Sequence, residues 1–408
     1  MEGILDTRKN FIGSMGFNYI FGDKSFNEAG QWMGWQYLVM YLIVGALFYL
    51  AVVKKFEPLL LLPIAFGMLL ANLPGTGMFH KEFFINTDPN FHMDITQIVA
   101  EGGLMDFLYL GVKLGIYPSL IFMAVGAMTD FEPLIANPKS FLLGAAAQFG
   151  IFFTLCLASM FFPINDAASI AIIGAADGPT SIVVANKLES QYLGAIMVAA
   201  YSYMALVPII QPPFIKLCTT KKERLIRMPY TQTEVKKITR ILFPIIITIV
   251  AGLVAPASVS LVGFLMFGNL IRECGVLNSL SETAQKVLAN LITIFLGITI
   301  ACQMHYDKFL RPSTLLILGL GLFAFIFDTA GGVLFAKLLN LFLPKGKKMN
   351  PMIGAAGISA FPMSSRVVHK LGLEADNQNF LLMHATGVNV SGQVASVIAG
   401  GMILSFFK

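Results

Sequence analysis

Apolar runs long enough to cross a lipid bilayer follow one another along most of this chain. Only 12% of the residues are charged and 56% are hydrophobic, whereas a soluble domain carries about 25% charged residues. Because a helix of about 20 apolar residues spans a membrane, we predict an all-α polytopic membrane protein with roughly ten transmembrane helices. The apolar runs lie at 34–53, 58–74, 107–128, 141–162, 193–215, 241–271, 289–304, 314–343 and 380–407.

Two short segments, 165–187 and 350–368, interrupt this pattern with glycine, proline and polar residues. Their glycine-rich cores begin at Gly174 and Gly354, which lie 354 − 174 = 180 residues apart. Interrupted membrane segments in corresponding halves are the sequence mark of a transport site. We predict two re-entrant hairpins in two repeats at 54–215 and 237–408, and the sequence leaves open whether the repeats are inverted.

The other regions are an N-terminal arm with the first transmembrane helix (1–53), a polar insertion (75–103) expected outside the lipid, and a basic loop (216–236). Eight basic residues and two acidic ones lie between 216 and 240, which predicts a cytoplasmic location. The formal charge of +5 lies largely in loops and forms no basic face, so we expect no nucleic-acid partner.

Asp177 is the sharpest candidate for chemistry. A carboxylate in the apolar run around it costs about 2.5–3.5 kcal/mol on insertion scales, so a bound cation or proton is the expected compensation. Glycine carbonyls and the hydroxyls of Thr180 and Ser181 are hard oxygen ligands that suit Na⁺. The alternative is that Asp177 caps a short helix at the interruption.

Further polar residues at membrane depth lie in the second hairpin and in two other apolar runs. Arg366 is either a bidentate partner for a carboxylate or an interfacial arginine at the hairpin end. Tyr201 and Tyr203 precede Pro208, and Asn389 lies in the last apolar run. Each of these is a ligand candidate or an ordinary packing or interhelical contact.

Several motifs are missing from the sequence. The chain has no GxxxxGK[ST] phosphate-binding loop and no Met-Lys-Met tripeptide of the kind that carries covalent biotin. Any energy for transport must therefore come from a gradient, a reaction or a partner subunit.

The chain resembles the β subunit of the biotin-dependent sodium-pumping decarboxylases, which include oxaloacetate, methylmalonyl-CoA and glutaconyl-CoA decarboxylases. The matching runs cover nearly the whole chain from about residue 50. They are Lys54–Pro63, Val125–Phe131, Gly144–Gly150, Ala176–Thr180, Ala199–Pro208 and Asn379–His384.

This resemblance implies an elevator-transporter-like fold in the bacterial inner membrane. It implies a subunit that decarboxylates carboxybiotin delivered by a carrier protein, consumes a proton and exports Na⁺. The implied partners, in an oligomeric complex, are a carboxyltransferase subunit, a biotin carrier protein that would dock near Lys221, Lys222 and Arg224, and a small membrane γ/δ-type subunit.

The resemblance also implies roles for individual residues. Asp177 and Asn389 correspond to sodium ligands, and Arg366 and Gly354 to carboxybiotin-binding residues. Tyr203, Arg366, Ser359 and Asn350 correspond to catalytic residues.

Two other hypotheses remain at this point. A secondary sodium/carboxylate symporter would use the same hairpins without enzymatic activity and without a partner. A purely structural membrane subunit would use its polar residues only to hold helices together, and Asp177→Asn would then leave activity intact.

Overall fold

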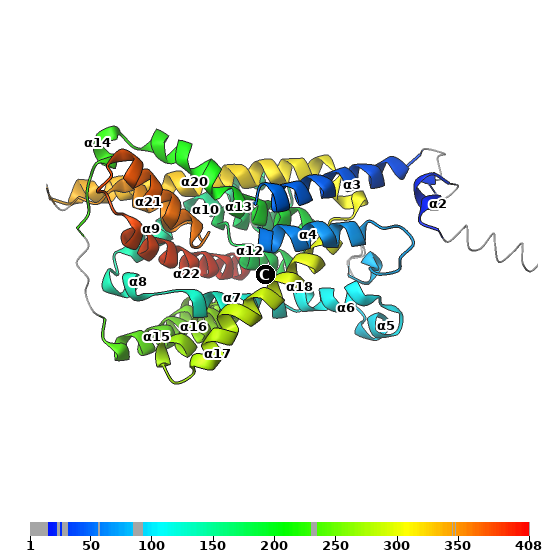
Figure 1. Cartoon of the computed structure of the whole chain (residues 1–408), viewed down its shortest axis with the longest axis horizontal. Coiled ribbons are helices and arrows are strands. Elements are labelled where there is room, and N and C mark those ends of the chain that lie inside the picture. The colour runs from blue at the N-terminus through cyan, green and yellow to red at the C-terminus, as the bar shows by residue number, and fades with distance from the viewer. Residues whose placement is uncertain are drawn as a thin grey trace, which may run out of the picture. The chain divides into compact units, whose positions relative to one another are not determined.

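The computed structural model describes residues 15–22, 25–26, 32–55, 58–84, 93–229, 235–344, 346 and 348–407. These residues form helices and turns and no strand longer than an isolated bridge between Phe26 and Trp32. The chain divides into two compact units (Figure 1). Unit 1 comprises Met1–Leu114 and Leu291–Thr314, and unit 2 comprises Gly115–Asn290 and Leu315–Lys408. Most of the N-terminal arm, including residues 1–14, 23–24 and 27–31, lies outside the described residues.

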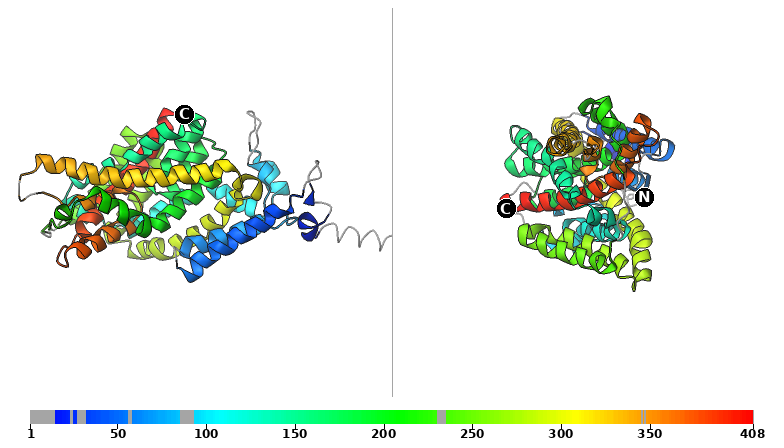
Figure 2. Two further views of the ribbon diagram at one scale, coloured as in Figure 1. Left: turned by 90° about the horizontal axis from the view of Figure 1, so that it is seen from above. Right: turned by 90° about the vertical axis from the view of Figure 1, so that its left-hand side faces the viewer.

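The described part of the chain contains seven helices that are long and apolar enough to cross a membrane, and two bent helix pairs raise this number to nine. The all-α polytopic membrane fold is therefore confirmed, while the count of ten and the two repeats stay predictions. The run at 241–271 is divided into α15 (Lys237–Val254) and α16 (Val259–Cys274). The run at 314–343 is one helix, α20 (Pro312–Phe342), which Figure 2 shows as a long continuous element in yellow to orange.

Unit 1 is held together by polar side chains at the ends of its helices. Asn72 follows α4 (Pro58–Ala71); its side chain donates to the carbonyl of Met304 at 2.9 Å and accepts from the amide of Tyr306 at 3.0 Å. Asp106 is fully buried in α6 (Leu104–Lys113) and lies 2.7 Å from Nδ1 of His80. These contacts fasten the described parts of the insertion to the helices of their own unit. The remaining elements of this unit are α2 (Phe17–Ile20), α3 (Gly34–Phe48), η2 (Tyr49–Val53), η3 (Lys81–Phe83), α5 (Ile95–Glu101), η7 (Ala301–Gln303) and α19 (Tyr306–Phe309).

Unit 2 carries both interrupted segments, and most of its helices pack around them. The element η6 (Thr283–Leu288) precedes the boundary at Asn290, and α18 (Ala289–Ile300) lies almost entirely in unit 1. The other elements of unit 2 are α7 (Ile116–Met128), α8 (Glu132–Ala136), α9 (Ser140–Ala147), α10 (Phe149–Ala158), α11 (Ile164–Ala171), η4 (Ile172–Ala175), α12 (Gly178–Lys187), α13 (Leu193–Cys218), α14 (Lys221–Arg224), η5 (Pro256–Ser258), α17 (Asn278–Glu282), η8 (Pro351–Gly357), α21 (Met363–Ala375) and α22 (Leu382–Phe406).

The interruption predicted at the first glycine-rich segment is confirmed. Helix α11 tightens into the 3-10 turn η4, and the chain then leaves helical geometry at Ala176, whose φ of 50° lies in the left-handed region. Asp177 is extended and begins α12. The second segment is likewise broken, because the 3-10 turn η8 ends at Gly357 and α21 starts only at Met363.

Helices α7 and α16 lie side by side in unit 2 (Figure 1). Gly126 of α7 faces the backbone of α16 at Leu265, and Gly268 of α16 faces the backbone of α7 at Met123. A side chain at either position would collide with a carbonyl oxygen, so the two helices approach each other only because both residues are glycine.

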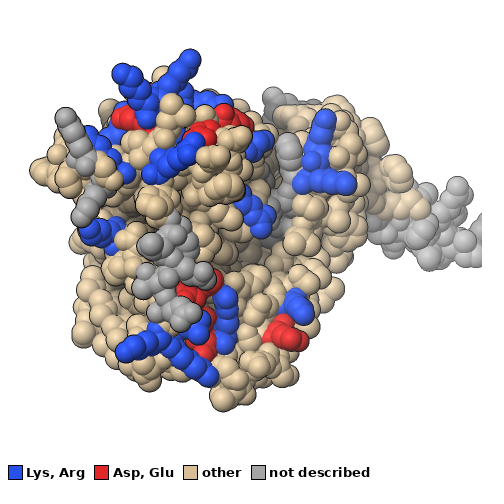
Figure 3. Space-filling model, turned by 60° about the vertical axis from the view of Figure 1, so that its left-hand side comes forward, with Lys and Arg blue, Asp and Glu red and all other residues tan. Residues whose placement is uncertain are grey.

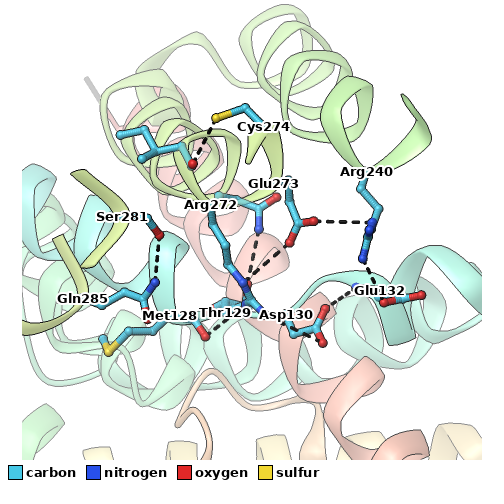
Figure 4. Close-up of polar contacts among 12 residues, drawn as sticks. Met128, Thr129, Asp130, Glu132, Arg240, Arg272, Glu273, Cys274, Ser281 and Gln285 are labelled. Atoms are coloured by element: carbon cyan, nitrogen blue, oxygen red, sulfur yellow. Dashed lines mark hydrogen bonds and ion pairs between the residues drawn. The ribbon is translucent and has the colours of Figure 1, made fainter. Parts of the chain in front are cut away.

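An ion-pair network joins the ends of α7, α8, α15 and α16 (Figure 4). Arg240 lies 3.4 Å from Glu132 and 3.5 Å from Glu273, and Arg272 lies 3.6 Å from Glu273 and 3.9 Å from Asp130. Single pairs at a partly exposed surface contribute little stability, but shared partners make these four helix ends one polar cluster. It closes the end of the glycine-packed helix pair.

The glycine contact predicts a clear stability difference. Gly126→Ala puts a methyl group against the Leu265 carbonyl, so we expect a loss of roughly 1–3 kcal/mol from overpacking, read as a lower Tm of the purified protein. Gly319→Ala in α20 is the matched control, because a Cβ there meets no atom within 4 Å. Equal Tm values for the two variants would contradict the close packing.

Candidate functional site

Asp177 lies at the first turn of α12 with its side chain 6% exposed. Its Oδ1 accepts from the amide of Thr180 at 3.3 Å, so the capping alternative describes a real contact. Its Oδ2 accepts three hydroxyl groups: Thr180 at 2.7 Å, Ser396 at 3.0 Å and Ser359 at 3.4 Å. A cap needs only one of these contacts, so the carboxylate does more than begin a helix.

The three hydroxyls come from three different elements. Thr180 is in α12, Ser396 is in α22, and Ser359 follows η8 in the second interrupted segment. The amide of Ser359 also donates to the carbonyl of Ala175 at 3.0 Å, which joins the two interrupted segments directly. Residues 182 positions apart, Asp177 and Ser359, therefore meet at one buried carboxylate.

The second interrupted segment is positioned by helices α13 and α20. Gly354 and Gly332 of α20 touch through their backbones, so neither position has room for a side chain. Gln211 of α13 is fully buried; it donates to the carbonyl of Ala355 at 2.9 Å and accepts the hydroxyl of Ser364 at 3.1 Å. These contacts satisfy backbone groups that the broken helix leaves free.

One face of α22 presents amide side chains to the same region. Asn389 donates to the carbonyl of Ile358 at 2.7 Å, next to Ser359, while its Oδ1 is buried without a hydrogen-bond partner. Gln393, one turn further along, also has a buried Oε1 without a partner. Ser396 continues this face, so α22 supplies two open acceptor oxygens and one hydroxyl.

The two tyrosines of α13 have different surroundings. The hydroxyl of Tyr203 donates to the carbonyl of Leu318 in α20. The ring of Tyr201 lies against Gly178, the residue after Asp177, and its hydroxyl is buried without a partner. Helix α13 is bent by 68° between Met204 and Leu206, as expected from Pro208, which cannot donate a backbone hydrogen bond to the preceding turn.

Arg366 and Asn350 stand apart from the carboxylate cluster. Arg366 is exposed in the first turns of α21, and its guanidinium makes no hydrogen bond or ion pair with the described residues. Asn350 begins η8 and is fully buried; its Oδ1 accepts from the amide of Met352, and its Nδ2 donates to the carbonyls of Arg224 and Ile226. Asn350, which was expected to be a catalytic residue, therefore also has a structural role.

Much of the basic loop is already bound to its own unit. Arg224 donates to the carbonyls of Lys216 and Thr219, each at 3.1 Å. Arg227 donates to Asp376 at 2.5 Å, and this contact holds the pKa of the Asp376 carboxyl below its usual range. The expected docking residue Arg224 is therefore fixed in place.

Ser396 and Gln211 did not emerge from the sequence as site residues. A serine in an apolar helix is common, and only its position two turns after Asn389 marks Ser396. Gln211 lies between Pro208 and Pro212, where a bent helix exposes backbone groups, and this is the signal that would identify it.

Comparison with known proteins decides what kind of subunit carries this site. The family model described as the Na⁺-transporting oxaloacetate decarboxylase beta subunit matches residues 36–407. The chain belongs to this family. It is a multi-pass membrane subunit of a sodium-transporting decarboxylase, and its function is decarboxylation coupled to sodium transport.

Named relatives span three decarboxylases. The methylmalonyl-CoA decarboxylase subunit beta of Propionigenium modestum is 50% identical over 379 residues, which cover 91% of this chain and 94% of the relative. The glutaconyl-CoA decarboxylase subunit beta of Acidaminococcus fermentans is 50% identical over 91% of this chain and 93% of the relative. The oxaloacetate decarboxylase beta chain of Klebsiella pneumoniae is 46% identical over 94% and 99%. This membership sets aside the symporter and the purely structural subunit.

The carboxylate cluster fits a sodium ion as the transported substrate. Na⁺ is a hard cation that binds oxygen, and the cluster contains a carboxylate and three hydroxyls. The helix α22 that supplies Ser396 also carries two buried amide oxygens without a partner. The described residues contain no group of three or more His, Cys, Asp or Glu side chains suited to other metal ions. An all-oxygen donor set of this kind is compatible with Na⁺.

Removing the Ser396 hydroxyl tests whether α22 belongs to the cation site. We expect Ser396→Ala to weaken the apparent Na⁺ affinity of decarboxylation about tenfold, because one polar contact to a charged group is lost. Ser391→Ala in the same helix is the matched control, since this buried hydroxyl donates to the carbonyls of Ser140 and Val388 instead. The expectation fails if Na⁺ titrations of both variants coincide.

Proposed function

We propose that the two interrupted segments form the site where carboxybiotin is decarboxylated and where Na⁺ is bound for export. The observation that carries this proposal is the hydroxyl cluster on Asp177, assembled from both segments and α22. A buried carboxylate with three hydroxyl partners and open amide oxygens nearby is a cation-binding arrangement. In this proposal Asp177 and Asn389 ligate the ion.

The reaction converts N-carboxybiotin and one proton into biotin and CO₂. The bond from the ureido nitrogen to the carboxylate carbon breaks, its electron pair returns to nitrogen, and nitrogen then takes the proton. Loss of CO₂ is faster when the carboxylate is stripped of water. The interrupted segments are almost entirely buried and supply such surroundings.

Arg366, Ser359, Asn350 and Gly354 receive the carboxybiotin in this proposal. The guanidinium of Arg366 has no partner among the described residues, and its planar donors match a carboxylate bidentately. Gly354 lets η8 approach α20 without a side chain between them. The hydroxyl of Ser359 contacts the carboxylate of Asp177, so a substrate that binds this serine would change the surroundings of the cation site directly.

Tyr203 relays the proton to the ureido nitrogen in this proposal. Its hydroxyl is already hydrogen-bonded to a carbonyl of α20, which orients the group. Sodium at Asp177 then links chemistry to transport, because a cation and a proton compete for one carboxylate and such coupling is reciprocal.

The biotin is covalently attached to a partner, a biotin carrier protein, and a carboxyltransferase subunit loads it. A small membrane γ/δ-type subunit completes the oligomeric complex. The only substrate of the membrane site is carboxybiotin. Specificity for the acyl donor therefore resides in the carboxyltransferase and not in this chain.

Replacing Asp177 tests the cation site. We expect Asp177→Asn to abolish Na⁺-stimulated decarboxylation while the complex still copurifies, because the amide removes the negative charge with little change in shape. Asp166→Asn is the control: Asp166 is 7% exposed and bonded to Ser190 at 2.6 Å, in the same unit but before the interruption. Sodium stimulation retained by Asp177→Asn would overturn the assignment.

The two tyrosines provide a paired test of the proton step. We expect Tyr203→Phe to lower kcat by about 10²–10⁴-fold, as is typical for loss of a general acid, and to keep Na⁺ affinity. Tyr201→Phe removes an equal volume from the same helix and should leave kcat far higher. If Tyr203→Phe loses Na⁺ affinity and turnover together, Tyr203 is an ion-site residue and the relay belongs to another group.

Docking of the carrier near the basic loop is tested at Lys222, which is exposed in α14. Reversing its charge in Lys222→Glu should raise the KM for biotinylated carrier, because electrostatic complementarity governs encounter. The KM for free carboxybiotin should stay unchanged. If the KM for the carrier is unchanged, the basic residues of this loop do not bind the carrier. Their role is then only to fix the loop on the cytoplasmic side, as the positive-inside rule predicts.

A further inference from the structure

A cavity of about 360 Å³ lies between the end of α13, α14 and α21. This volume is within the range of small-molecule sites, about 300–1,000 Å³. The cavity belongs to unit 2 and is separate from the Asp177 cluster. Its lining residues are Lys216, Lys221, Arg224, Leu225, Leu371, Glu374 and Ala375.

The lining combines positive charge with an apolar wall. Three cations face one carboxylate, Glu374, which lies 3.1 Å from Lys216 in a half-exposed ion pair. Leucine and alanine side chains complete the lining. Figure 3 shows Lys and Arg side chains gathered, with fewer acidic ones among them, at the top of the view, the side on which Figure 1 places α14. The cavity therefore suits an anionic group on an apolar ring.

The exposed face of α21 leads from this cavity toward the second interrupted segment. Arg366, Lys370 and Glu374 are spaced four residues apart, which places them on one face of the helix. Arg366 and Lys370 are exposed, and Glu374 lines the cavity. With a rise of 1.5 Å per residue, Arg366 lies about 12 Å along the helix from Glu374.

The cavity is also connected to the second interrupted segment through Arg224. This residue lines the cavity, and its carbonyl accepts from Asn350 at 3.0 Å and from Asn379 at 2.9 Å. Asn350 in turn begins η8. A ligand that shifts Arg224 therefore acts on the residue that starts the second segment.

We propose that this cavity is an entry site for the carboxylated biotin ring, which is bound there before it moves along α21 to Arg366. This inference rests on the proposed function, because it adds a binding site that the same substrate occupies before it reaches the site of decarboxylation. Lys216 and Lys221 attract the carboxylate, and Leu225 and Leu371 contact the ring. Binding at this site lowers KM and leaves the chemical step unchanged.

The test compares wild-type complex with Lys216→Gln/Lys221→Gln, using freshly prepared free N-carboxybiotin as substrate. We expect a KM about tenfold higher with kcat unchanged, because two charged contacts made only at entry are lost. Lys139→Gln, an exposed lysine outside the cavity, is the control and should keep the wild-type KM. Using the free ring keeps carrier docking at Lys222 out of the measurement.

The possible results are distinguishable. If wild-type complex does not decarboxylate free carboxybiotin at all, the proposed function fails. If wild type is active and the double variant keeps its KM, or if Lys139→Gln raises KM equally, the entry site is overturned. A double variant that loses activity and regains it with added anionic phospholipid would assign the cavity to a lipid headgroup instead, and would also overturn the proposal.

Discussion

The hydrogen bond from the Ser359 amide to the Ala175 carbonyl is the contact on which the arrangement of the site depends. Both groups belong to interrupted helices, and at membrane depth an unpaired amide or carbonyl costs several kcal/mol, on the order of the full desolvation penalty. Each segment thus satisfies the other. The same contact brings the Ser359 hydroxyl to Asp177, so backbone pairing and the cation site are formed together.

Helix α20 packs against both interrupted segments. Asp328, fully buried in this helix, accepts from the amide of Gly150 at the start of α10 at 2.5 Å. Its other oxygen faces Gly174, where a Cβ would approach within 2.7 Å. Ten residues before Asp328, Leu318 accepts from Tyr203, and four residues after it, Gly332 touches Gly354. One straight helix therefore contacts both interrupted segments and the proposed proton relay.

The sequence predicted the fold class and the positions of the interruptions because their causes are local. Apolar runs form helices, and glycine with proline breaks them at Ala176 and after Gly357. The sequence also identified Asp177 from its charge in an apolar run. Two further polar residues of the apolar runs join distant segments: Gln148 donates to the carbonyl of Gly357, and Asp328 accepts from the amide of Gly150.

The partners of these residues could not be predicted, because they depend on packing between distant parts of the chain. Ser396 reaches Asp177 from 219 positions away, and its place two turns after Asn389 is the only sequence signal for it. The Nδ2 of Asn350 donates to two carbonyls of the basic loop, those of Arg224 and Ile226. The position of Asn350 in the second hairpin did not suggest this contact. The residue pattern left the roles of Arg366 and Tyr203 open between chemistry and ordinary packing. Their catalytic roles came from the family resemblance, and these roles stay proposals.

The central claim is that Asp177 and the hydroxyls around it hold the transported cation. The most direct measurement is an experimental structure of the complex soaked in thallium, a monovalent cation with strong anomalous scattering. We expect an anomalous peak in contact with Oδ2 of Asp177, between Ser359 and Ser396, that excess Na⁺ removes. A Na⁺-displaceable peak elsewhere, with none at Asp177, would contradict the account.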